Sequence, residues 1–196
     1  MTVIKVGHDE KEFDGNVSIN NLRSVATVAL YTAATGVSEI LRHAGVRHTI
    51  GGGVAVCCNG YGRTTQNVDY VVGKCAFEYR DKALFLRPEL PVRYLGIPIH
   101  YIAPSNPFEQ AMLDQYLTIP AHGVVPVLPL NPLIVMKLIA RRHKDRADVV
   151  ELLKRCAGPT VESALAFVSE NLPSQKDVFE GLVADAEAET VAEGGV

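Results

Sequence analysis

Three consecutive glycines, Gly51 to Gly53, interrupt an apolar stretch and limit what the surrounding chain can form. Before them lies a strand-like piece, and after them come a short apolar segment, a polar loop and a second strand-like piece: residues 47–50, 54–58, 59–65 and 67–72. Glycine permits sharp turns and close approach of the backbone to another group. Two interpretations stay open. The turn could cradle a phosphate beside a helix N-terminus, or it could simply be a tight turn that needs glycine.

Strand patterns occupy the first two thirds of the chain and helix patterns the last third. Apolar residues recur every three or four positions between Leu22 and Ala44, which predicts a helix, and Gly45 suits its left-handed end. Residues 93–102 predict one or two further strands, residues 108–116 a helix and residues 124–128 a short strand. A helix is expected from Pro132 through Arg142, and helical spacing continues after it. This order predicts an α+β fold, in which a small mixed sheet is flanked by helices and followed by a helical C-terminal part.

The same pattern predicts the organisation of the chain. We expect an N-terminal arm over residues 1–20, an α/β core over 21–130 and a helical C-terminal subdomain over 131–184. A capping-box pattern, Ser174 with Asp177, predicts the start of the last helix. Residues 185–196 hold four acids and no base, so we expect this tail to be disordered.

Composition excludes several classes of function. The 196 residues carry 19 Lys and Arg against 22 Asp and Glu, a net charge of −3, so general nucleic-acid binding is not expected. No run of 18 apolar residues exists, and the first fifteen residues lack the apolar core of a secretory signal. Four cysteines without C-x-x-C spacing suit a reducing compartment. We expect a cytoplasmic protein without a membrane partner; its oligomeric state does not follow from the sequence.

Two blocks of sequence resemble a known family. Residues 52–69 follow the order G-G-x-A-x-x-x-x-G-x-x-R-x-T-x-(D)-x-D, and residues 133–148 resemble L-x-x-x-K-L-x-A followed by an arginine and then K-D-x-x-D. The chain therefore resembles the nucleotidyltransferase-fold superfamily related to DNA polymerase β, and looks closest to its small prokaryote-type branch, which includes abortive-infection toxins. The resemblance spans about residues 46 to 155. It implies a sheet of the nucleotidyltransferase type and transfer of a nucleoside monophosphate from a nucleoside triphosphate to an acceptor.

The chemistry that the resemblance implies uses two Mg²⁺ ions held by a D-x-D pair and a third carboxylate on a neighbouring strand. Here Asp69 holds the second position of the pair, but Asn67 holds the first. The next strong strand carries His100 and no acid. Two of three metal carboxylates are thus missing, which leaves Asp69 and Asn67 as a weak metal-ligand set.

Three hypotheses follow for function. In the first, a working transferase uses Mg²⁺ and a third acid elsewhere. In the second, the chain binds nucleotide without catalysis. In the third, the chain is a repurposed enzyme that needs no cofactor, and Asp69 and His100 perform acid–base chemistry on a small molecule. The expected partner is a nucleotide or another small-molecule substrate.

The resemblance also suggests residues that contact a bound nucleotide: Gly52, Gly53, Arg63, Thr65 and Lys137. Each has a structural alternative. Arg63 could hold a triphosphate or brace the loop, and Thr65 could tie the loop to the following strand. Lys137 could reach toward phosphate or extend to the surface. A group of charged residues after it is expected to form a solvated salt-bridge face: Arg141, Arg142, Lys144, Asp145 and Asp148.

Overall fold

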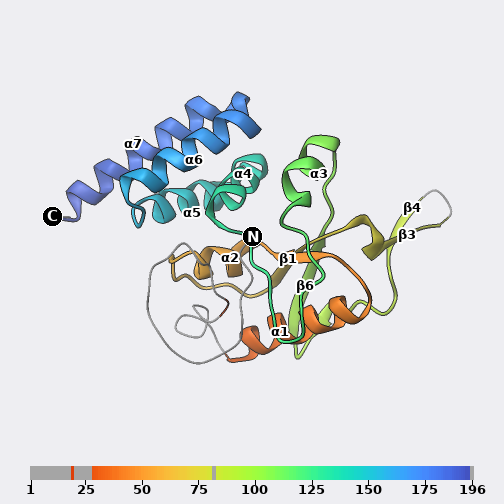
Figure 1. Cartoon of the computed structure of the whole chain (residues 1–196). Helices are drawn as coiled ribbons and strands as arrows, with labels where there is room; N and C mark the ends of the chain where they lie inside the picture. The colour runs from red at the N-terminus through yellow and green to blue at the C-terminus, as the bar shows by residue number, and fades with distance from the viewer. Residues whose placement is uncertain (1–18, 20–27, 81–82, 195–196) are drawn as a thin grey trace. The chain divides into compact units, whose positions relative to one another are not determined.

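The computed structural model describes residue 19 and residues 28–80 and 83–194, which form two compact units (Figure 1). Unit 1 combines Met1–Cys58 with Gly62–Leu128, and unit 2 combines Asn59–Tyr61 with Pro129–Val196. Helices and a small mixed sheet confirm the predicted α+β class, and the last third is helical as expected. The expected N-terminal arm, apart from Ile19, and the first turns of the expected helix fall outside the described residues.

Unit 1 is built on a four-stranded sheet with the order β1-β2-β6-β5. Its strands are β1 (His48–Ile50), β2 (Val68–Val72), β5 (Arg93–Tyr94) and β6 (Ile97–Ile102). β1 pairs antiparallel with β2, β2 pairs parallel with β6, and β5 pairs antiparallel with β6. Both strand-like pieces around the glycine run are therefore strands, and the short apolar segment between them is helix α2 (Gly52–Cys58).

Helix α1 (Val28–His43) packs on one face of this sheet. Its buried residues include Ala34, whose carbonyl oxygen accepts a hydrogen bond from the hydroxyl of Tyr70 on β2. Tyr70 stacks on Tyr101 of β6, with ring centroids 6.2 Å apart. Because side chains alternate along a strand, the residues next to Tyr70 and Tyr101 project from the opposite face. Gly45 ends α1 at φ 68°, as predicted.

A separate hairpin lies between β2 and β6 in the chain and was not predicted. Strands β3 (Phe77–Arg80) and β4 (Ala83–Leu86) pair only with each other, after a short 3₁₀ turn over Lys74–Ala76. Several of its apolar side chains are exposed, so it lacks the buried face by which strands are recognised in a sequence.

The segment after β6 differs partly from expectation. Helix α3 (Pro107–Asp114) forms where a helix was expected and is capped by Asn106, whose side chain accepts a hydrogen bond from the Glu109 N–H. Residues 124–128, expected as a strand, make only a single bridge between Val127 and Ile50 in the described structure. This segment nevertheless adds buried side chains beside β1.

Glu39 on α1 binds the loop that precedes residue 124. Its carboxylate accepts hydrogen bonds from the Gly123 N–H and Arg42 Nε, each at 2.8 Å, and from His122 Nδ1 at 3.2 Å. Burial alone would raise the pKa of Glu39, but these hydrogen bonds outweigh it and lower the pKa from 4.5 to about 2. Glu39 therefore stabilises unit 1 in its ionised form.

We expect Glu39→Gln to lower the free energy of unfolding by about 1–2 kcal/mol at pH 7, since the carboxylate is partly solvated. The folded pKa lies below the unfolded one, so the unfolded state binds more protons between pH 4.5 and about 2. The wild type should therefore lose its greater free energy of unfolding relative to Glu39→Gln as the pH falls through this window. Urea unfolding at pH 7 and pH 3 measures the difference; an equal difference at both pH values would contradict the assignment.

Unit 2 is a group of four helices: α4 (Leu130–Ala140), α5 (His143–Leu153), α6 (Gly158–Asn171) and α7 (Lys176–Ala192). Figure 1 shows α6 and α7 side by side, and α4 contacts α5 and α6 while α5 contacts α7. Arg155 lies over the ring of Tyr61, 4.9 Å from its centroid, which attaches residues 59–61 to this unit. Among the described residues, no helix is both long and apolar enough to cross a membrane.

Two expectations for the last helix are wrong. The tail is helical through Ala192, because Ala186 is buried and Lys154 Nζ lies 3.1 Å from Glu189 Oε2 and 2.6 Å from Glu193 Oε1. Two of the acids that predicted disorder are thus paired with Lys154, which directly follows α5. The capping box also does not form: a 3₁₀ turn over Pro173–Gln175 comes first, and Gln175 caps α7 without a side-chain hydrogen bond.

Candidate functional site

The parallel pairing of β2 with β6 brings two of the predicted site residues together. Asp69 and His100 are direct register partners. Neighbouring strands lie about 4.8 Å apart, so side chains at one register position on one face can contact each other. Both side chains project from the face opposite α1. The strand expected to hold a third carboxylate is thus beside Asp69, and it places a histidine there.

The Asp69 carboxylate is held by two donors. Its Oδ1 atom lies 3.0 Å from His100 Nδ1 and 2.6 Å from Asn67 Nδ2. Asn67 lies two residues before Asp69, which places both side chains on the same side of the extended chain. A carboxylate oxygen can only accept, so both nitrogens donate to it, although they lie 3.2 Å from each other.

The contact with Asp69 determines which ring nitrogen of neutral His100 carries the proton. When Nδ1 of neutral His100 carries the proton that it donates to Asp69, Nε2 is unprotonated and can accept a proton. The His100 side chain is 60% exposed, whereas that of Asp69 is only 19% exposed. The imidazole is therefore accessible to a substrate while the carboxylate behind it is largely covered. Hydrolytic enzymes use such an Asp–His pair to orient a general base.

The glycine run lies directly against this pair. Gly52 has φ 56°, and a Cβ atom built on it would lie 1.8 Å from Asp69 Oδ2. The N–H of Gly51 donates to the carbonyl oxygen of Asp69 at 2.8 Å. The left-handed φ of Gly52 agrees with the interpretation of a tight turn that needs glycine, and the close approach to Asp69, which the sequence did not predict, adds a second reason for glycine there. Contact of Gly52 with a ligand stays a prediction.

Gly53 brings two further predicted residues to the same place. A Cβ atom on Gly53 would lie 2.6 Å from Thr65 Oγ1 and 3.2 Å from Arg63 Nη2. Thr65 Oγ1 donates to the carbonyl oxygen of Asn67 at 3.3 Å, so it ties the loop to the start of β2 as expected. Arg63 Nη1 donates to the Thr64 carbonyl oxygen at 3.0 Å. Gly52, Asn67 and His100 thus lie against the Asp69 side chain, while Thr65 and Arg63 lie against the neighbouring Gly53.

Lys137 lies in unit 2, on α4, and is only 5% exposed. Its Nζ atom lies 2.9 Å from Asp145 Oδ1 and also donates to Asp148 Oδ2, both on α5. Arg142 Nε donates to Asp145 Oδ2 at 2.6 Å. The expectation of a solvated salt-bridge face is wrong for these carboxylates, because both are buried against α4. A role of Lys137 toward phosphate stays a prediction.

The donor set around Asp69 does not fit the Mg²⁺ pair that the resemblance implies. Mg²⁺ requires several oxygen ligands in near-octahedral geometry. Asp69 is a single carboxylate, and its Oδ1 already accepts two hydrogen bonds. Asn67 presents its amide nitrogen, not its oxygen, to that carboxylate. Across the part of the chain that the structure describes, no group of three or more His, Cys, Asp or Glu residues is arranged to hold a metal.

Sequence reasoning missed the role of Asn67. It identified this residue only as a poor metal ligand, whereas the side chain donates to Asp69. The spacing of two residues, with a donor amide beside a carboxylate on one strand, was the available signal. Comparison with known proteins adds no assignment: no protein-family model matches the chain, and no curated protein matches its sequence at a significant level.

Proposed function

We propose that the chain is a metal-independent enzyme whose Asp69–His100 pair performs general acid–base chemistry on a small molecule. The observation that carries this proposal is the 3.0 Å hydrogen bond between Asp69 Oδ1 and His100 Nδ1, with an exposed imidazole in front of a covered carboxylate. The resemblance of residues 52–69 to nucleotidyltransferases supports a nucleotide as the substrate. Transferase activity through Mg²⁺ is the alternative. The side chains around Asp69 support it less well, because they offer a single carboxylate for the metal.

In the proposed reaction, Nε2 of His100 removes a proton from a hydroxyl group or water while the oxygen of that group forms a bond to a phosphorus atom of the nucleotide. The bond between this phosphorus and the leaving oxygen breaks as the new bond forms. The positive charge that develops on the imidazole is stabilised by the Asp69 carboxylate through the Nδ1–H donor. Asn67 holds that carboxylate in place by donating to the same oxygen. Protonated His100 can then return its proton to the leaving group. General acid–base groups of this kind typically contribute about 10²–10⁴-fold to a rate.

Incubation of the chain with ATP, CTP, GTP and UTP, followed by ³¹P NMR, tests this proposal. We expect turnover of at least one nucleotide to continue in EDTA and to fall about 100-fold or more in His100→Ala. Asp69→Asn should also reduce the rate strongly, because the base loses its orienting carboxylate. His122→Ala, which removes an exposed histidine of the same unit, is the matched control and should leave the rate unchanged.

A metal titration separates the proposal from the transferase alternative without any substrate. We expect no saturable Mn²⁺ binding to the wild type by calorimetry, and new binding in Asn67→Asp, which creates a carboxylate pair. Tight metal binding by the wild type that is lost in Asp69→Ala would contradict the proposal and favour a transferase. Nucleotide binding without turnover, in the presence or absence of Mg²⁺, would instead indicate a non-catalytic binding protein.

A further inference from the structure

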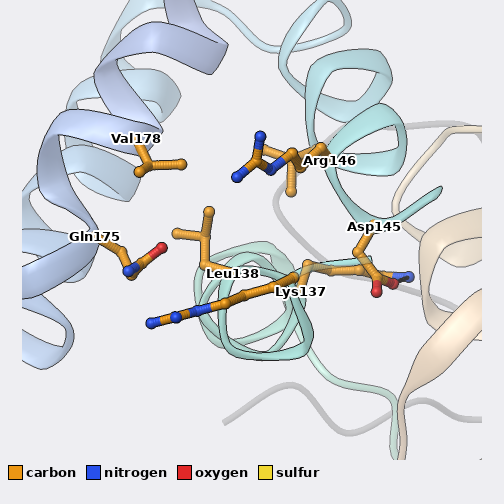
Figure 2. Close-up of a pocket in the computed structure, with 8 residues that line it drawn as sticks. Lys137, Leu138, Asp145, Arg146, Gln175 and Val178 are labelled. Atoms are coloured by element: carbon orange, nitrogen blue, oxygen red, sulfur yellow. Dashed lines mark hydrogen bonds and ion pairs between the residues drawn. The ribbon is translucent and has the colours of Figure 1, made fainter. Parts of the chain in front are cut away.

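A pocket in unit 2 gathers positive charge that the proposed function does not use. It lies between the end of α4, the first turns of α5 and the start of α7. Arg141, Arg146 and Gln175 line it together with Lys137, Asp145 and Leu138. Figure 2 shows Arg146 and Gln175 pointing into one space over Leu138, while Lys137 extends toward Asp145.

The charges around the pocket do not cancel. Lys137 and Arg142 pair with the buried carboxylates of Asp145 and Asp148, so these four groups are neutral as a set. Both oxygens of Asp145, the acid that lines the pocket, accept hydrogen bonds within this set. The positive charges of Arg141 and Arg146 are not balanced by this set. Within the described residues, neither guanidinium group makes a side-chain hydrogen bond or ion pair.

Arg141 occupies an unusual position for an arginine. It follows α4 directly and has φ 57°, the left-handed conformation that glycine or asparagine normally supplies after a helix. A residue with a side chain is strained there by about 1–2 kcal/mol. Its N–H donates to the Lys137 carbonyl oxygen at 3.2 Å, a bond that glycine would make equally well. The backbone contact therefore does not require the guanidinium group.

We propose that this pocket binds a single phosphate group, held by the guanidinium groups of Arg141 and Arg146 and by the amide of Gln175. Guanidinium groups bind phosphate oxygens through paired, charge-assisted hydrogen bonds. The first turn of α7, which contributes Val178 to the pocket, adds the positive end of its helix dipole. The space that these side chains enclose is small, about 10 Å³, and it opens to solvent. It has room for one phosphate oxygen, with the rest of the group at the solvent-exposed mouth beside the two arginines, and not for an enclosed small molecule.

A structural role is the competing explanation. Arginines near the last turn of α4 also offset the partial negative charge of its carbonyl groups. The two explanations differ in what Arg141→Gly does. If the guanidinium group serves stability, the variant should melt at a lower temperature. If it serves ligand binding, relief of the strained backbone should keep or raise the melting temperature while phosphate affinity falls.

Calorimetric titration of the full chain with inorganic phosphate tests the site. We expect saturable binding that weakens at least about tenfold in Arg141→Gly and in Arg146→Gln. Lys144→Gln is the matched control: it removes one exposed positive charge from the same segment, at a residue that does not line the pocket, and should change affinity less than about threefold. His100→Ala should bind phosphate as the wild type does, so this result is independent of the proposed function.

Phenyl phosphate, titrated in parallel, identifies the source of the group. Tighter binding than inorganic phosphate indicates a phosphomonoester that extends out of the pocket, and weaker binding indicates the free anion; either order supports the site. Absence of saturation up to about 20 mM phosphate would overturn the proposal. Equal losses in Lys144→Gln and the two arginine variants would also overturn it, because general surface charge would then explain the binding.

Discussion

Replacement of Lys137 with methionine is expected to lower the free energy of unfolding by about 3–5 kcal/mol at pH 7. The substitution removes the cation that Asp145 and Asp148 share, and all three side chains are buried. A buried carboxylate without its partner keeps its desolvation penalty and loses the attraction that offset it. Lys144→Met, on the exposed side of α5, should cost less than about 0.5 kcal/mol.

The loss of stability in Lys137→Met should be smaller at acid pH than at neutral pH. Burial alone would raise the pKa of Asp145, but hydrogen bonds from Arg142 and Lys137 outweigh it and hold the pKa below 3.8. The stabilisation is therefore present above that value and is lost as the pH falls through it. We expect the difference between wild type and variant, measured by urea unfolding, to be largest near neutrality and to shrink in acid.

A second substitution checks the explanation. Lys137→Met combined with Asp148→Asn should be more stable than Lys137→Met alone, because one uncompensated charge is removed. A loss below about 1 kcal/mol in Lys137→Met at pH 7 would contradict the argument. In that case the lysine would contribute little to unit 2, and its role toward a phosphate, which the resemblance suggests, would become the better explanation of its position.

Gly52→Ala is expected to cost about 1–3 kcal/mol more than Gly45→Ala. Both glycines have left-handed backbone, with φ 56° and 68°, so alanine meets the same conformational penalty at each. Nothing lies within 4 Å of a Cβ atom on Gly45, whereas one on Gly52 would lie 1.8 Å from Asp69 Oδ2. The excess measured by thermal unfolding therefore reports the contact between the glycine turn and Asp69.

The contact predicts coupling between the two positions. Asp69→Ala removes the clashing carboxylate, so Gly52→Ala should cost less in that background than in the wild type. The imidazole signals of His100 in NMR spectra should shift in Gly52→Ala and stay unchanged in Gly45→Ala. Additive costs for Gly52→Ala and Asp69→Ala, with no change at His100, would show that the turn does not position the carboxylate.

The site of unit 1 was largely predictable because its signals are local. A glycine run, a polar loop and an acid in an apolar segment predicted two strands around a short apolar piece, and the structure forms β1, α2 and β2 there. The parallel pairing of β2 with β6 could not be predicted in this way, because the register that places His100 opposite Asp69 depends on residues about thirty positions apart. The resemblance suggested both residues as acid–base groups but not their contact.

Errors arose where tertiary contacts override local patterns. Arg141 ends α4 in a left-handed conformation without the glycine that would signal it, so the helix was expected to continue through Arg142. Asp145 and Asp148 have the spacing of a surface salt-bridge pattern. Both carboxylates are nevertheless buried, and both pair with Lys137 of the neighbouring helix. Lys154 similarly organises the acidic end of α7 from another helix. Charge patterns along one helix do not reveal a partner on the next.

The hairpin of β3 and β4 can change in sequence without changing the four-stranded sheet. It interrupts the chain between β2 and β6, which are neighbours in the four-stranded sheet, yet it forms a two-stranded sheet of its own. The ladder that aligns Asp69 with His100 does not include it. Mutation, lengthening or replacement of the hairpin can therefore create new recognition surfaces, displayed from exposed residues such as Tyr79 and Leu84, while the pairing that holds Asp69 opposite His100 is left intact.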